Sequence, residues 1–153
     1  KPYIDMIIPT LVDPSMAPPG KHVISCFVQY APYKLAPELG SWDDQRDAFG
    51  DAVIDRIAEF APNIRDVIIH RNVQTPLDIE RTTGLTEGNI FQGELSLEQL
   101  FFNRPVPGYA RFRTPVRDLW LCGSATHPGG GIMGANGRIA ALEVLRSRGR
   151  RAA

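Results

Sequence analysis

The residues best suited to chemistry lie in a glycine-rich segment near the end of the chain. Five glycines fall within the nine residues from Gly129 to Gly137. Glycines leave backbone amides uncovered, so a ligand can approach them closely. The segment also leads into a helix-like run, whose first N–H groups and dipole favour negative charge. A tight turn for helix packing is the alternative, but five glycines cost backbone entropy, so a ligand-binding segment is the better hypothesis.

Gly129, Gly131 and Gly134 also fit the spacing G-x-G-x-x-G of a dinucleotide-binding fingerprint. In that fingerprint the glycines sit at the strand–helix turn itself, and a second strand ends in an acidic residue about 20 residues later. Here five residues separate Gly123 from Gly129, and arginines follow in place of a second strand. We therefore reject a dinucleotide fingerprint.

Other candidate residues are few. No pair of histidine, cysteine or acidic residues has metal-ligand spacing, so we expect no metal site. Ser124 lacks a G-x-S-x-G context, which argues against a hydrolase. His127 precedes the glycines and fits either a proton shuttle beside a ligand or a loop residue bonded to backbone. Cys26 and Cys122 lie in apolar runs and are expected to be buried free thiols.

Whole-chain properties exclude several classes of function. The 153 residues carry a formal net charge of zero, which gives no electrostatic footprint for nucleic acid. The one basic cluster is interpreted as the charged end of a helix, and it comprises Arg146, Arg148, Arg150 and Arg151. No apolar stretch approaches the roughly 20 residues of a membrane span. With no signal peptide visible, the expected location is the bacterial cytoplasm.

The elements that would carry these residues form two groups. In the first, residues 3–11 and 22–31 are rich in β-branched and aromatic residues and predict two strands joined by a long loop. A helix should start at Ser41, with Asp44 completing a capping box, and run to Pro62 with one buried apolar face. Residues 67–73 predict a third strand. These elements favour an antiparallel or mixed sheet with a helix on it, an α+β fold.

The second group contains shorter elements. Thr75–Pro76 predicts a helix start and Gly84 its end, and residues 96–102 predict a brief helix. Residues 103–116 have the composition of an ordered loop. Residues 118–123 predict a short apolar strand, and a final helix is expected from about Gly134 to Arg146. Five aromatic residues could line an apolar channel or pack in a core: Phe101, Phe102, Tyr109, Phe112 and Trp120.

A family resemblance becomes visible in residues 119–134, which read LWLCGSATHPGGGIMG. This run resembles the C-terminal FAD motif of phytoene-desaturase-type oxidoreductases, also described as NAD(P)/FAD-dependent or pyridine nucleotide-disulfide oxidoreductase domain-containing proteins. The resemblance extends to residues 13–22 (DPSMAPPGKH), 75–81 (TPLDIER), 88–91 (GNIF), 99–100 (QL) and 104–105 (RP). It therefore covers nearly the whole chain, and the run 119–134 is its most specific part.

The resemblance implies a two-part organisation. Residues 1–116 would be the later part of a substrate-binding domain, and residues 117–153 the C-terminal strand, glycine-rich loop and helix that complete an FAD-binding domain. The N-terminal Rossmann segment, which holds the ADP half of FAD in this family, would be a missing partner. By resemblance the FAD contacts are Gly123, Ser124, His127, Gly130, Gly131, Ile132, Met133 and Gly134, with the last three against the isoalloxazine ring. Related flavoenzymes often have an acidic residue where this chain has Ser124.

The function that follows is a dehydrogenase or desaturase transferring a hydride from an apolar substrate to flavin, with no catalytic residue assigned. A chain lacking the Rossmann segment is expected to be inactive alone and to bind FAD weakly. Unpaired strand edges favour a homodimer, and the full-length enzyme is expected at a membrane surface. The alternative is a non-catalytic module that binds a small anion or dimerises.

Overall fold

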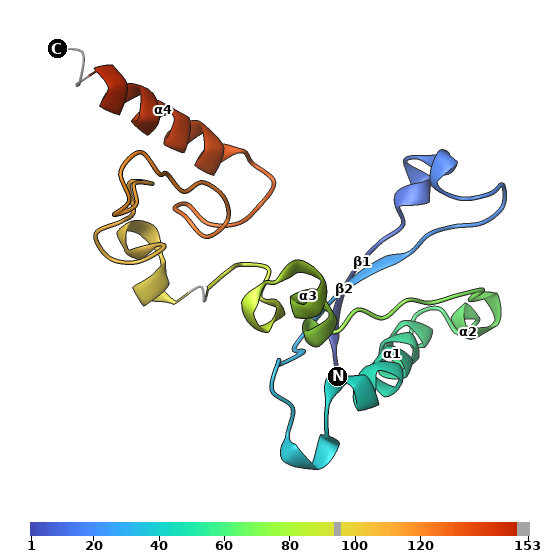
Figure 1. Ribbon diagram of the computed structural model, residues 1–153. Helices are drawn as coiled ribbons and strands as arrows, with labels where there is room; N and C mark the ends of the chain where they lie inside the picture. Colours follow the sequence, from blue (N-terminus) through green and yellow to red (C-terminus); the bar gives the residue numbers. More distant parts are fainter. Residues whose placement is uncertain (94–95, 150–153) are drawn as a thin grey trace. The chain divides into compact units, whose positions relative to one another are not determined.

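The computed structural model describes residues 1–93 and 96–149, which excludes Arg150 and Arg151 of the basic cluster. The chain divides into two compact units, Lys1–Thr83 and Gly84–Ala153. Within the described residues the regular structure comprises four α-helices, six short 3-10 helices and one two-stranded antiparallel sheet (Figure 1). The fold is thus a small mixture of α and β elements, as expected in outline.

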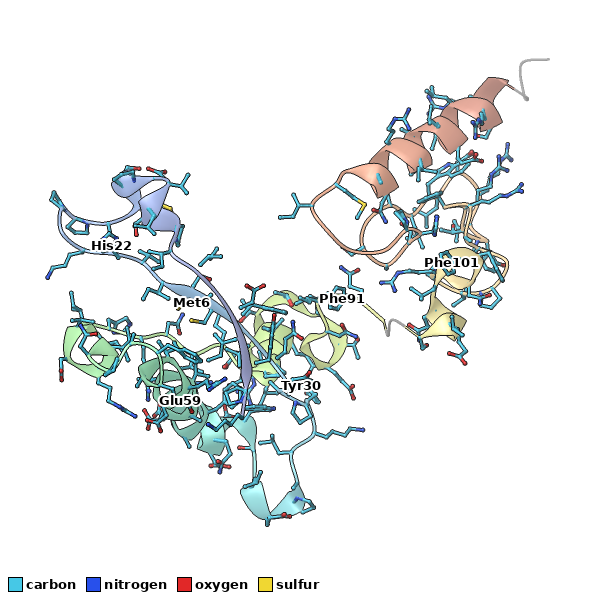
Figure 2. The ribbon with its side chains drawn as sticks, turned by 180° about the vertical axis from the view of Figure 1, so that it is seen from behind. Met6, His22, Tyr30, Glu59, Phe91 and Phe101 are labelled. Carbon is cyan, nitrogen blue, oxygen red and sulfur yellow. The ribbon has the colours of Figure 1, made fainter. Side chains whose placement is uncertain are left out.

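The first unit begins with a β-hairpin. Strand β1 (Tyr3–Ile7) pairs with β2 (Ser25–Gln29). Both strands are shorter than predicted, because Pro9 starts the 3-10 helix η1 (Pro9–Leu11) and ends the first strand. The buried Thr10 hydroxyl lies 3.0 Å from Nδ1 of His22, which ties the two sides of the connection together. Figure 1 shows this end of the hairpin standing clear of α1, and Figure 2 labels His22 on it.

Helix α1 (Trp42–Ala58) starts where the capping box predicts. The Ser41 side chain accepts from the Asp44 amide, and the Asp44 carboxylate accepts from the Ser41 amide. Trp42 is buried and meets the edge of the Phe49 ring at 5.2 Å between centroids. The predicted apolar face is only partly buried, since Phe60, beyond the helix end, is 77% exposed.

The predicted third strand, residues 67–73, is wrong. Residues Ile64–Val67 form the short helix α2, and the chain after it pairs with no strand in the part of the chain that the structure describes. Ile69 is 76% exposed. The β-branched run has strand propensity, but a strand needs a neighbouring strand for its backbone hydrogen bonds. The sheet therefore has two strands.

Helix α3 (Pro76–Thr83) confirms the prediction for this segment and is bonded to α1. Thr75 and Asp78 form a reciprocal cap, and Gly84 follows with a φ of +73°. The Arg81 guanidinium donates two hydrogen bonds to the Asp43 carboxylate, of 2.7 and 2.9 Å. These polar contacts join two helices that bury few apolar side chains.

This α1–α3 contact gives a pH-dependent prediction. The hydrogen bonds from Arg81 hold the pKa of Asp43 below its usual 3.8. The folded pKa is thus the lower one, so the ionised carboxylate stabilises the fold above about pH 4 and stops doing so as the pH falls through the folded value. We expect Asp43→Asn to lower the melting temperature modestly at pH 7 and by less at pH 2.5, because protonation of Asp43 removes the same charge. Thermal unfolding at both pH values checks this, with Asp66→Asn as the exposed control; an equal deficit at both would contradict it.

The second unit has little regular structure before its last helix. Three 3-10 turns, Thr86–Gly88, Leu97–Gln99 and Phe101–Asn103, precede a long loop. The predicted strand 118–123 is wrong: only one bridge forms among the described residues there, between Arg113 and Trp120. Helix α4 (Ala135–Gly149) closes the described chain and runs three residues beyond the predicted end. No helix among the described residues is long and apolar enough to cross a bilayer.

Candidate functional site

The glycine-rich loop, defined here as residues 123–134, leads directly into the N-terminus of α4. Its middle is enclosed, since Gly129 is buried, and its last four residues are exposed. Ile132 is fully exposed and Met133 is 56% exposed. Two large apolar side chains therefore stand in solvent immediately before a helix start.

Asn136, in the first turn of α4, holds the inner side of the loop. Its Nδ2 group donates to the carbonyl oxygens of Gly123 at 2.8 Å, Thr126 at 3.0 Å and His127 at 3.4 Å, and lies 3.2 Å from the Thr126 hydroxyl. Asn136 is 7% exposed and Thr126 is 2% exposed. Only the amide nitrogen of the side chain can face so many oxygens. The start of the helix and the loop are thus one hydrogen-bonded assembly.

Arg104 holds the same loop from a second direction. It is 2% exposed. Its Nε and Nη2 groups donate to the Ser124 carbonyl at 3.1 and 2.8 Å, and the guanidinium also bonds the carbonyls of Phe91 and Gln99. A buried arginine is rare and needs partners for its donors. Here backbone carbonyls from three segments supply them.

The loop backbone favours glycine at three exposed positions, Gly123, Gly131 and Gly134. Gly123 has a φ of +125° and Gly131 a φ of +123°, values that side chains rarely adopt. A Cβ on Gly123 would meet no atom within 4 Å, so this position borders open space. Among the described residues, the backbone N–H groups of Gly130, Gly131, Ile132 and Met133 have no acceptor. This part of the loop therefore offers backbone amides whose hydrogen-bonding capacity the described residues leave unused.

The predicted site residues thus fall into two groups. Gly123, Ser124 and His127 lie on the segment that Arg104 and Asn136 anchor, and His127 contributes its carbonyl to that anchoring. The exposed turn before α4 comprises Gly131, Ile132, Met133 and Gly134, and the half-buried Gly130 lies between the two groups. Sequence reasoning missed the two anchoring side chains, although both lie in or beside segments that resemble the family.

Several other expectations concern nearby residues. Cys122 is exposed and Cys26 only half-buried, so the prediction of two buried thiols is wrong; partial burial raises the pKa of the Cys26 thiol. Of the five aromatic residues, Phe112 is buried at 3% exposure, whereas Phe101 and Phe102 are 62% and 75% exposed. Core packing therefore accounts for Phe112, and Trp120 is half-buried beneath the Arg113 guanidinium. No metal-binding cluster of His, Cys, Asp or Glu is present in residues 1–93 and 96–149.

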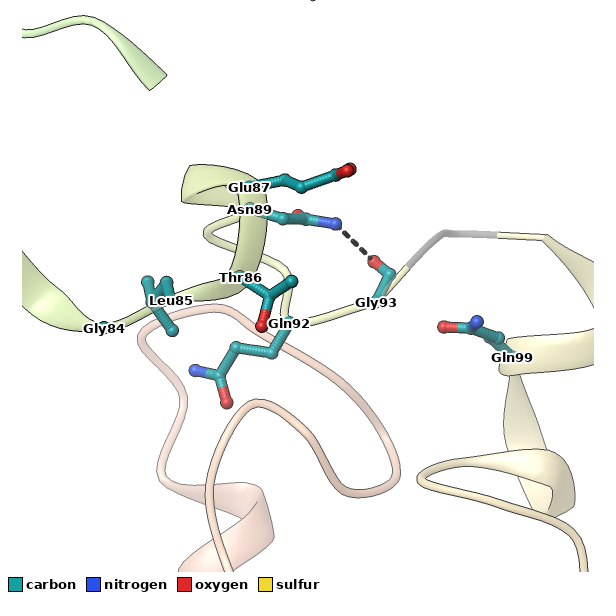
Figure 3. A pocket seen from close by; sticks show the side chains of 8 residues that line it. All are labelled: Gly84, Leu85, Thr86, Glu87, Asn89, Gln92, Gly93 and Gln99. Atoms are coloured by element: carbon teal, nitrogen blue, oxygen red, sulfur yellow. Dashed lines mark hydrogen bonds between the residues drawn. The ribbon is translucent and has the colours of Figure 1, made fainter. Parts of the chain in front are cut away.

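A depression of about 520 Å³ elsewhere in the second unit contains none of the predicted site residues (Figure 3). Its lining is Gly84, Leu85, Thr86, Glu87, Asn89, Gln92, Gly93 and Gln99. Asn89 Nδ2 donates to the Gly93 carbonyl at 3.2 Å, as the dashed line in Figure 3 marks. Ligand pockets are mostly apolar with a few polar groups, and this polar, open depression differs from them.

Comparison with known proteins finds sequence similarity to proteins that are named as oxidoreductases. It is 49% identical to pyridine nucleotide-disulfide oxidoreductase domain-containing protein 2 of Rattus norvegicus, over 95% of the chain and 25% of that protein. It is 32% identical to one of the subunits of limonene dehydrogenase from Castellaniella defragrans (92% and 26%) and 31% identical to a lycopene-forming phytoene desaturase of Pseudescherichia vulneris (82% and 25%). No protein-family model matches the chain, and no solved structure matches it.

The chain thus spans about a quarter of the length of these curated relatives. The similarity extends over nearly all of its residues, including both units and the glycine-rich loop. Over that quarter, the chain is homologous to pyridine nucleotide-disulfide oxidoreductase domain-containing protein 2 and to the phytoene desaturases.

Proposed function

We propose that this chain supplies the glycine-rich loop of an FAD site, together with part of a substrate-binding domain, to a dehydrogenase or desaturase acting on an apolar substrate. Two relatives are named for reactions on hydrocarbons, limonene and the product lycopene. The proposed division of the chain, residues 1–116 for substrate and 117–153 for cofactor, follows the family resemblance.

One observation carries this proposal: the loop combines backbone N–H groups that have no acceptor among the described residues with two exposed apolar side chains, Ile132 and Met133. Ile132 and Met133 would lie against a flat ring, and the adjacent N–H groups would face its polar edge. Isoalloxazine has an apolar face and a rim of carbonyl and nitrogen acceptors. The residues present therefore fit a flavin.

The chain's own groups would act by orientation and electrostatics. A bound flavin supplies a two-electron acceptor whose pyrimidine edge gains negative charge on reduction. The unpaired N–H groups of the turn just before α4 would stabilise charge at that edge, because they are fixed before the reaction and adjoin the positive end of the helix dipole. Ile132 and Met133 would exclude water from the ring, which strengthens those interactions.

The amount of exposed surface also supports a role within a larger protein. The chain exposes 11351 Å², whereas two separate globular bodies of half its mass would expose about 9,300 Å². Large apolar side chains contribute to this excess in both units, among them Val12, Tyr30, Phe102 and Ile132. Large exposed apolar patches mark surfaces that another protein segment, a second copy or a membrane covers. A homodimer through the hairpin and contact with a membrane surface remain part of the proposal.

Anaerobic reduction tests the proposed activity. The full-length protein that contains this chain is purified with its flavin, and limonene or phytoene is added in detergent micelles, with glucose as the polar control. We expect the flavin absorbance to bleach with a hydrocarbon and not with glucose. If glucose bleaches the flavin and neither hydrocarbon does, the proposed substrate class is wrong. A full-length protein that contains no flavin would contradict the proposal itself.

A further inference from the structure

Four carbonyl groups of the glycine-rich loop point toward the two anchoring side chains. Asn136 Nδ2 donates to the carbonyl oxygens of Gly123, Thr126 and His127. The Arg104 guanidinium donates to the carbonyl oxygen of Ser124. The Gly123 carbonyl also accepts from the Thr126 amide at 3.0 Å. The carbonyl oxygens of this segment therefore face the anchoring side chains and accept hydrogen bonds from them.

Peptide geometry then fixes where the donors point. In a trans peptide the C=O and the following N–H are antiparallel, and the peptides that join residues 123 to 127 are not among the cis bonds of the chain. The N–H groups of Ser124 and His127 therefore point away from the Asn136 side chain, and the N–H group of Ala125 points away from the Arg104 guanidinium. Within the described residues none of these three amides has an acceptor. A segment whose carbonyl groups face inward and whose N–H groups face outward can bind an anion through those N–H groups.

Charge favours the same kind of ligand. Arg104 is almost fully buried and forms no ion pair with any described carboxylate; carbonyl oxygens are its partners. Uncharged acceptors satisfy its N–H groups, and no carboxylate in residues 1–93 and 96–149 pairs with its positive charge. A buried charge is poorly screened by salt, so it raises the potential at the loop it supports.

We propose that Arg104 and Asn136 are positioning residues that turn the amides of Ser124, Ala125 and His127 toward a phosphate-bearing ligand, the pyrophosphate of FAD. This inference rests on the proposed function and adds the two side chains that prepare the loop. Neither touches the ligand; each acts by holding carbonyl groups on the opposite side of the peptide planes.

The test compares FAD with riboflavin, which has the same ring and no phosphate. Affinities of both ligands are measured for the full-length apoprotein and for Arg104→Gln, Arg104→Lys and Asn136→Ser, with Arg146→Gln as an exposed arginine control in α4. We expect Arg104→Gln to lower the affinity for FAD at least tenfold and the affinity for riboflavin less than threefold. Arg104→Lys keeps the charge but cannot make the paired bond to the Ser124 carbonyl, so it should recover only part of the FAD affinity, and Arg146→Gln should change the affinity for neither ligand.

Each outcome either supports or contradicts the positioning role of Arg104 and Asn136. Equal losses for FAD and riboflavin, or no loss for either, would overturn the proposal, because a merely structural role affects both ligands alike. If Arg104→Gln gives no folded protein, Asn136→Ser decides by the same ratio. An unmodified protein that binds neither ligand would contradict the proposed function instead, which separates the two failures.

Discussion

Valine in place of Gly131 is expected to weaken FAD binding to the full-length protein at least tenfold. Gly131 has a φ of +123°, and a Cβ there would lie 2.9 Å from Cε of Met133. A β-branched residue in this backbone region costs about 1–3 kcal/mol of stability. Affinity falls because the new side chain would displace Met133 and cover amides that we propose face the flavin, and about 1.4 kcal/mol of lost contact energy corresponds to a tenfold change in affinity. Flavin content after purification and titration of the apoprotein measure the effect.

The matched control is Gly108→Val in the same unit. Gly108 has a φ of +87°, and a Cβ at this position would meet nothing within 4 Å, so the variant carries comparable backbone strain away from the loop. We expect this variant to lose stability and to keep its FAD affinity. If Gly131→Val retains full affinity, or if both variants lose FAD equally, the loop does not contact the cofactor.

The second large effect concerns the chain alone, which should bind FAD at least about a hundredfold more weakly than the full-length protein does. The glycine-rich loop offers amides for one part of the cofactor, whereas the family resemblance assigns the ADP half to another segment. Loss of a second set of contacts on the same ligand removes several kcal/mol, and each 1.4 kcal/mol is tenfold. Fluorescence titration of the 153-residue chain with FAD measures this affinity.

Micromolar binding by the chain alone would contradict that expectation and favour a self-sufficient binding module. Riboflavin is the useful comparison, because it has the same ring but lacks both the adenosine that the other segment would hold and the pyrophosphate that we propose the loop contacts. We expect the chain alone to bind FAD more tightly than riboflavin, because only FAD carries the pyrophosphate.

Local signals predicted the helices α1 and α3 of the first unit correctly. Their starts depend on reciprocal contacts between residues three apart, Ser41 with Asp44 and Thr75 with Asp78. Such capping contacts form within one turn, so the sequence contains all the information they need. The end of α3 at Gly84 is local for the same reason.

Errors arose where structure depends on distant partners. Residues 67–73 and 118–123 have strand-like composition, yet neither forms a strand, because pairing depends on a neighbour that composition does not specify. The glycine-rich loop was found from its own sequence. Its anchor Arg104 was not, because arginine is usually exposed and its contact with Ser124 joins residues 20 apart.

A structure of the full-length protein with its bound ligand tests most directly whether the exposed turn before α4 lies against a flavin. We expect density for FAD with its ring beside Ile132, Met133 and Gly134. Density showing that turn covered by other side chains, with the flavin elsewhere or absent, would contradict the proposed site.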